Sequence, residues 1–154
     1  MQTESEKTTP IGLIRYAQDF YDCAIAADRV VGMRPGYEII APIPVMYLVG
    51  HSIELCLKSY LLFCGVSIKV LRNKPYGHDL TECYKKAKEL GLPSHVELSK
   101  DDEEVIEILS ALYSKKLLNY IEVGEKTFPV FGPIQTVNTT LLKSVKLAVG
   151  YPEL

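Results

Sequence analysis

The chain has 154 residues, of which 47% are hydrophobic and 23% are charged. This composition is typical of one globular domain and excludes a disordered chain. The formal net charge is -2, so no global positive charge attracts the protein to nucleic acid. Any nucleic-acid site therefore has to be a local patch. None of the four cysteines belongs to a C-x-x-C pair. Zinc-ribbon and thioredoxin-type sites are therefore excluded. Cys23, Cys56 and Cys83 lie in amphipathic stretches, where a reduced thiol packs as a small apolar residue, so a reducing, cytoplasmic compartment is expected.

The first half of the chain predicts two long helices. Residues 1–9 are polar and lack the apolar run of a signal peptide, so we expect a flexible N-terminus there and one helical domain over residues 10–150. A helix is predicted over residues 10–31, because Pro suits a first helical turn and Gly32 suits the exit. A connector with Pro and Gly precedes a second predicted helix over residues 44–64.

The second half predicts three more helices, over residues 79–90, from Ser99 to about residue 123, and over residues 134–149. Ser99 suits an N-cap because Asp102 follows three residues later. A single helical turn is expected around residues 69–71. No convincing strand pattern is present, although residues 38–41 and 127–131 are compatible with short extended pieces. The fold class is all-α, a four- or five-helix up-down bundle.

The second predicted helix is apolar around its whole circumference except for His51, Glu54 and Lys58. Central charges are costly in lipid, so we expect a buried bundle helix and no membrane span. The three residues lie at i, i+3 and i+7 and share one face. Glu54 and Lys58 should pair, because an unpaired buried charge is very costly. Two interpretations remain open: a structural polar network, or the wall of a binding site.

A second polar group lies in the segment before the third predicted helix and includes Arg72, Asn73, His78 and Asp79. Asp79 favours a helix N-terminus, and His78 is either structural or a titratable group. An Arg close to a His would suit metal-free RNA cleavage, in which His78 transfers a proton and Arg72 stabilises charge on the phosphate. Asn73 and Asp79 are further candidate binding residues.

A third group, Tyr113, Lys116 and Tyr120, shares one face near the end of the fourth predicted helix. Aromatic stacking and phosphate contacts would suit nucleic acid. Alternatively, the tyrosine rings pack on the bundle with their hydroxyls in water, and the lysine favours the helix C-terminus. The sequence has no metal-ligand spacing and no phosphate-binding Gly loop, so no metal and no cofactor are expected.

The order of these motifs resembles the HEPN superfamily. A helix that reads HSIELCLKSYL over residues 51–61 is followed by GHDL over residues 77–80 and by KELGL over residues 88–92. A tyrosine-containing segment then ends in Asn119-Tyr120. This order is similar to that of small bacterial HEPN-type proteins, which carry a HAIELxLKxxL helix, then GHDL, then a Tyr-rich helix that ends in RY. The resemblance covers roughly residues 43–124 and implies a HEPN-like helical bundle.

The resemblance also implies a function. The family is associated with nucleotide binding and with metal-independent ribonucleases, often in toxin–antitoxin or phage-defence systems. Active members are usually homodimers that join Arg and His pairs across their interface. Arg72-Asn73 followed by His78 fits that motif, whereas Asn119 replaces the Arg of the RY pattern. We therefore expect a HEPN-like nucleotide- or RNA-associated binding module, a homodimer, with an antitoxin as a further partner. The alternative is a metal-independent endoribonuclease that uses Arg72 and His78.

Overall fold

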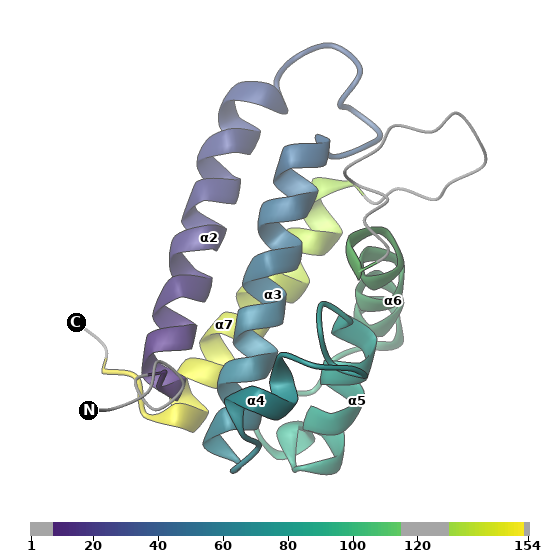
Figure 1. The fold of residues 1–154 in the computed structure, drawn as a ribbon. Helices are drawn as coiled ribbons and strands as arrows, with labels where there is room; N and C mark the ends of the chain where they lie inside the picture. The colour runs from purple at the N-terminus through teal and green to yellow at the C-terminus, as the bar shows by residue number, and fades with distance from the viewer. Residues whose placement is uncertain (1–7, 115–129, 153–154) are drawn as a thin grey trace.

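The computed structural model describes residues 8–114 and 130–152, and within these ranges every regular element is a helix. The predicted all-α bundle is therefore confirmed (Figure 1). The elements in chain order are α2 (Pro10–Val31), α3 (Ile43–Phe63), α4 (Ile68–Leu71), α5 (Leu80–Glu89), the 3-10 turn η1 (Leu92–Ser94), α6 (Lys100–Ser114) and α7 (Phe131–Val149).

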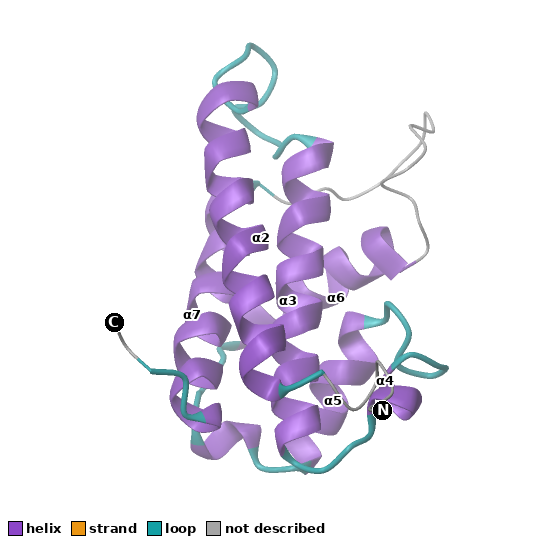
Figure 2. Cartoon of the chain, turned by 60° about the vertical axis from the view of Figure 1, so that its left-hand side comes forward, coloured by secondary structure: helices purple, strands orange, loops and turns teal. Residues whose placement is uncertain are grey.

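Helix α3 is the centre of the bundle. It contacts α2, α7, α5 and α6, and most of its residues are buried. The long helices α2, α3 and α7 run side by side, and the shorter α5 and α6 pack on the other side of α3 (Figures 1 and 2). Polar side chains on α3 can therefore be reached from several elements at once, which is the arrangement that a buried polar site requires.

The ends of the helices follow from local signals. Thr9 caps α2, because its Oγ1 accepts a hydrogen bond of 2.9 Å from the Gly12 amide, and Pro10 occupies the first helical turn. Ser99 and Asp102 form a reciprocal cap at α6, with two hydrogen bonds of 3.1 Å. The predicted starts of both helices are confirmed. The predicted part of the fourth helix beyond Ser114 lies outside the described residues.

One predicted helix start, one 3-10 turn and one possible extended piece differ between the prediction and the structure. Helix α7 begins at Phe131, three residues earlier than predicted, because Pro133 is tolerated in a first turn, where its missing N–H has no partner to lose. The 3-10 turn η1, which contains Pro93, was not predicted. Residues 38–41 form bends and coil, not a strand; residues 127–129 of the other predicted extended piece lie outside the described residues.

The core is apolar and its cysteines are reduced. Cys56 and Cys83 are buried and free, and burial raises the pKa of the Cys83 thiol to about 12, so the thiol stays protonated and unreactive. Cys23 is exposed. The prediction that it packs as a small apolar residue is wrong, because the buried face of α2 passes through its neighbour Ala24. In the described ranges, no helix combines the length and the apolar run needed to cross a bilayer.

Candidate functional site

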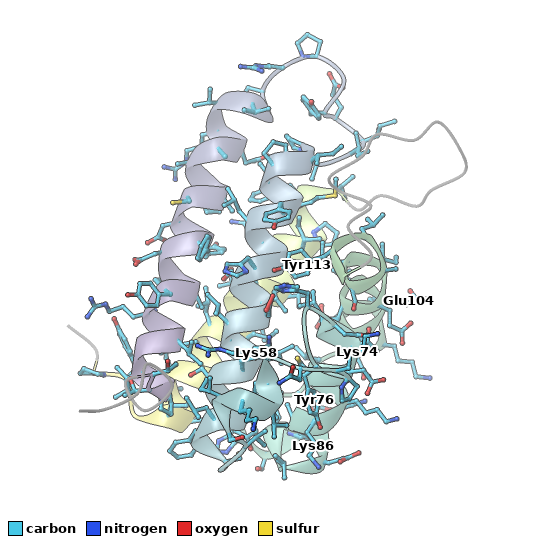
Figure 3. The ribbon with its side chains drawn as sticks, in the orientation of Figure 1. Lys58, Lys74, Tyr76, Lys86, Glu104 and Tyr113 are labelled. Atoms are coloured by element: carbon cyan, nitrogen blue, oxygen red, sulfur yellow. The ribbon has the colours of Figure 1, made fainter. Side chains whose placement is uncertain are left out.

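The carboxylate of Glu54 is the centre of the candidate site. Only 3% of the residue is exposed, in the middle of α3. Lys58 Nζ donates to Oε2 at 3.0 Å, the Tyr113 hydroxyl donates to Oε1 at 2.6 Å, and His78 Nδ1 lies 2.9 Å from Oε1. The donors come from α3, from α6 and from the turn before α5. Tyr113 reaches from α6 to α3 in Figure 3. The buried carboxylate of Glu54 thus contacts side chains from three parts of the chain.

The predicted pair of Glu54 and Lys58 is confirmed. The Lys58 side chain is 12% exposed, and its ammonium also donates to the backbone carbonyl of Gly77. This second bond holds the turn before α5 against α3. The pair therefore neutralises a buried charge and also positions the segment that carries His78.

His51 joins the cluster through Tyr113. Its Nδ1 lies 3.7 Å from Glu54 Oε1, which is too far for a hydrogen bond, but 2.9 Å from the Tyr113 hydroxyl. The single hydroxyl proton of Tyr113 goes to Glu54, so His51 Nδ1 has to be the donor to the phenol oxygen. The Phe20 ring meets the His51 ring at 4.4 Å and 83°, which fixes the imidazole from the side of α2. Within the described residues, Nε2 of His51 has no hydrogen-bond partner.

His78 binds the same carboxylate directly. Its Nδ1 lies 2.9 Å and 3.2 Å from the two oxygens, and an ionised carboxylate only accepts, so Nδ1 carries a proton. The side chain is 63% exposed. Because Nδ1 faces the buried anion, Nε2 lies on the far edge of the ring. The two histidines, 27 residues apart in the sequence, are thus neighbours around one carboxylate, each with Nε2 free of partners in the described part of the chain.

The environment keeps Glu54 ionised. Burial alone would raise the pKa of its carboxyl group. The His51 imidazole, the charge of Lys58, and the donors His78 and Tyr113 outweigh burial and lower the pKa to about 2. Burial and the adjacent Glu54 charge both raise the pKa of Tyr113. At neutral pH the cluster therefore contains a carboxylate anion, an ammonium cation and a neutral phenol.

The other predicted catalytic residue, Arg72, lies in the exposed segment between α4 and α5. It is the C-cap of α4, and it is not among the hydrogen-bond, ion-pair or ring partners of His78 in the described residues. The predicted pairing of Arg72 with His78 stays a prediction. Asn73 is structural in part: its side chain donates to Lys69 O at 2.6 Å. The turn that carries Lys74 and Tyr76 lies close to Lys58 (Figure 3).

Asp79 acts as a helix cap. Its Oδ1 accepts a hydrogen bond of 3.1 Å from the Glu82 amide and one of 3.2 Å from Ser110 Oγ, which fixes the start of α5 against α6. Asp79 therefore lies at the N-terminus of α5, as predicted. Lys116 and Tyr120 lie outside the described residues, so the predicted aromatic and basic face is represented by Tyr113 alone.

Sequence reasoning missed Phe20 and Gly50. A Cβ atom at Gly50 would lie 3.0 Å from Tyr113 Cδ2, so the absence of a side chain there lets Tyr113 approach α3. The available signal was a glycine in the interior of an otherwise apolar helix, which indicates a close approach. For Phe20, nothing in the sequence pointed to its contact with His51.

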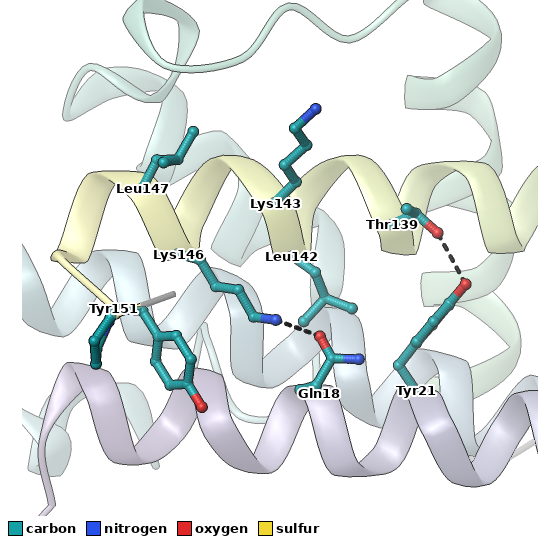
Figure 4. A pocket seen from close by; sticks show the side chains of 9 residues that line it. Gln18, Tyr21, Thr139, Leu142, Lys143, Lys146, Leu147 and Tyr151 are labelled. Carbon is teal, nitrogen blue, oxygen red and sulfur yellow. Dashed lines mark hydrogen bonds between the residues drawn. The ribbon is translucent and has the colours of Figure 1, made fainter. Parts of the chain in front are cut away.

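A second concave region lies between α2 and α7 (Figure 4). It has a volume of about 640 Å³. Lys146 and Leu142 of α7 point towards Gln18 and Tyr21 of α2, and Lys146 Nζ donates to Gln18 Oε1. Neither a histidine nor a carboxylate is among its described lining residues. The groove offers space but lacks a histidine and a carboxylate, so the Glu54 cluster is the better candidate for chemistry.

The fold and the cluster define a class: an all-helical bundle in which one buried carboxylate orients two histidines. No family model, no curated protein and no solved structure matches the chain. In the part of the chain that the structure describes, no group of three or more His, Cys, Asp and Glu side chains has the arrangement of a metal site.

Proposed function

We propose that the chain is a HEPN-like binding module that holds a phosphate group of RNA or of a nucleotide at His51 and His78. The observation that carries this proposal is that both imidazoles are fixed through Nδ1 around Glu54, directly or through Tyr113. An imidazole held in this way presents Nε2 outwards, and its protonated form donates from Nε2 to a phosphate oxygen.

The charges beside His78 support a phosphate ligand. Lys69, Arg72 and Lys74 are exposed, and none has a side-chain hydrogen bond or ion pair to any described residue. By contrast, Lys86 and Lys88 on α5 pair with Glu89 and Glu103. Three cations without a side-chain partner among the described residues therefore lie close together on the segment that leads to His78. This is the local basic patch that a chain of net charge -2 needs to attract a polyanion.

The resemblance to the HEPN superfamily supports the wider setting of this proposal. It favours a cytoplasmic homodimer that works in a toxin–antitoxin or phage-defence system, with an antitoxin protein as partner. Sedimentation of the purified chain at micromolar concentration tests the dimer: a single species with twice the mass of the chain is expected, and a monomer contradicts it.

Binding of a short fluorescent single-stranded RNA at low salt tests the central proposal. We expect wild type to bind, and His78→Ala to bind roughly tenfold or more weakly, because a hydrogen bond to a charged group contributes about 1.5–3 kcal/mol. Lys143→Ala is the matched control: it removes an exposed charge from α7, away from the cluster, and should bind like wild type. Absence of binding, or equal losses in the two variants, contradicts the proposal.

A second candidate function is a metal-independent endoribonuclease, favoured by the pairing of two imidazoles around one carboxylate. One histidine would accept the proton of the 2′-hydroxyl as its oxygen attacks phosphorus, and the other would donate a proton to the departing 5′-oxygen. In this arrangement His51 is the partner of His78, and Arg72 holds the phosphate. Incubation with mixed RNA in EDTA tests it. Cleavage by wild type but by neither His51→Ala nor His78→Ala supports the enzyme, and intact RNA in all samples leaves binding alone.

A further inference from the structure

An exposed aromatic residue continues the polar stripe of α3. Tyr47, His51, Glu54 and Lys58 lie at i, i+4, i+7 and i+11, and so share one face of the helix. Although α3 is the most buried helix of the bundle, 45% of Tyr47 is exposed. Its ring meets the ring of Tyr113 at 5.5 Å and 67°. Tyr113 is itself fixed by its hydrogen bond to Glu54, so Tyr47 is part of the same cluster.

We infer that Tyr47 is the platform on which a nucleobase stacks while the phosphate of the same nucleotide lies at His51 and His78. This inference rests on the proposed function and adds the part of the ligand that the ring recognises. Tyr47 is one helical turn, about 6 Å along the axis, from His51, which is comparable with the length of one nucleotide. Any base has a face that can stack on an aromatic ring, and such stacking is a main source of affinity for single strands.

The ring is prepared for this role. The edge-to-face contact with Tyr113 restrains Tyr47 before a ligand arrives, so little side-chain freedom is lost on binding. Stacking on an isolated ring requires a base that is free of its neighbours and its pairing partner. The ligand class is therefore single-stranded RNA or a mononucleotide, and a continuous duplex is excluded.

Exposure alone does not distinguish Tyr47. Tyr16 on α2 and Phe63 at the end of α3 are 57% and 52% exposed, but neither has a ring contact with any described residue of the cluster. Tyr47 is set apart because it alone of these three combines an exposed ring with a contact to the residues around Glu54. Tyr16 is therefore a suitable control for a general effect of surface aromatics.

Calorimetric titration with uridine 5′-monophosphate and with ribose 5-phosphate tests the inference, because the two probes differ only in the base. Wild type should bind the nucleotide roughly tenfold more tightly than the sugar phosphate. Tyr47→Ala should bind both with similar affinity, whereas Tyr47→Phe and Tyr16→Ala should keep the preference. Tyr47→Leu keeps an apolar contact with Tyr113 but has no flat ring, so it should lose the preference while the fold is preserved.

The outcomes separate the inference from the proposed function. If wild type binds both probes equally, or if Tyr47→Ala keeps the preference for the nucleotide, the stacking platform is wrong while phosphate binding stands. If neither probe binds, the proposed function fails and the platform fails with it.

Discussion

Glu54 shows why a buried carboxylate is tolerated in this core. An isolated buried charge would be very costly, but here the Lys58 ammonium compensates it and donors from His78 and Tyr113 satisfy its oxygens. Removal of this charge would leave Lys58 without its carboxylate partner, so a substitution of Glu54 should lower the free energy of unfolding strongly. The size of this effect should depend on pH, because the pKa of Glu54 is lowered in the folded protein.

The first prediction is that Glu54 makes stability fall with acid. Its pKa drops from 4.5 to about 2 on folding, so its ionised form contributes stability above pH 4.5, and this contribution is lost as the pH falls towards 2. The loss should be about 2 kcal/mol by pH 3 and about 3 kcal/mol by pH 2. Urea unfolding at pH 7, 5, 4 and 3 measures it. Glu54→Gln should be less stable at pH 7 and lack this part of the acid dependence, and Glu54→Ala should cost about 3 kcal/mol or more at pH 7.

Glu104→Gln is the control for this experiment, because Glu104 is exposed on α6 and is not part of the Glu54 cluster. Its acid dependence should match that of wild type. A loss below about 1 kcal/mol for Glu54→Ala would contradict the buried pair and indicate a weak, solvated one. Equal acid dependence in wild type and Glu54→Gln would contradict the depressed pKa.

At the scale of elements, the approach of α6 to α3 depends on Gly50. A Cβ atom there would meet Cδ2 and Cγ of Tyr113 at 3.0 Å and 3.1 Å, at the rigid base of the ring. Gly50→Ala gains up to about 1 kcal/mol of helix propensity, but overpacking costs about 1–3 kcal/mol. We expect a net loss of about 1 kcal/mol in urea unfolding, together with weaker acid dependence, because Tyr113 is displaced from Glu54.

Gly132→Ala isolates the helix propensity. Gly132 lies in the first turn of α7, and a Cβ atom there meets nothing within 4 Å. The substitution should be neutral or stabilising by up to about 1 kcal/mol. If Gly50→Ala behaved like Gly132→Ala, the close approach of Tyr113 to α3 would not matter for stability.

The helices were predictable from sequence where local signals fix them. Thr9 with Pro10, and Ser99 with Asp102, mark helix starts within four residues of chain, and the structure confirms both. The start of α7 was predicted three residues late, because a proline reads as a boundary and also fits a first turn.

The site was predictable only in part, because its contacts are long-range. The pair of Glu54 and Lys58 follows from helical spacing within α3, and the structure confirms it. The contact of His78 with Glu54 spans 24 residues and that of Tyr113 with Glu54 spans 59. No local pattern encodes which elements meet, so His51 and His78 were separate candidates. Tyr113 was predicted either to stack on a ligand or to pack on the bundle with its hydroxyl in water, whereas its hydroxyl donates to the buried carboxylate.

At the scale of the whole molecule, a buried polar chain joins the three long helices. Ser52 Oγ on α3 donates to the Ala17 carbonyl on α2 at 2.7 Å, and Asn138 Nδ2 on α7 donates to Ser52 Oγ at 2.8 Å. Ser52 and Asn138 are fully buried. Among the described residues, Asn138 Oδ1 has no hydrogen-bond partner. These hydrogen bonds set how α2, α3 and α7 lie against one another, but one buried acceptor in the group is unsatisfied.

The last prediction concerns a double-mutant cycle of Ser52 and Asn138. Ser52→Ala should cost about 2 kcal/mol, because it leaves the buried Asn138 amide without its acceptor. Asn138→Leu keeps the branched outline of the side chain and removes the unsatisfied oxygen, so it should cost less than about 1.5 kcal/mol. The double variant should be more stable than the sum of the two losses implies, by about 1 kcal/mol, because no buried amide remains to be left unpaired. Urea unfolding at pH 7 gives all three values, and the volume change at position 138 cancels in the cycle. Additive losses would mean that Ser52 and Asn138 stabilise the bundle independently, and that the hydrogen bond between them contributes nothing measurable.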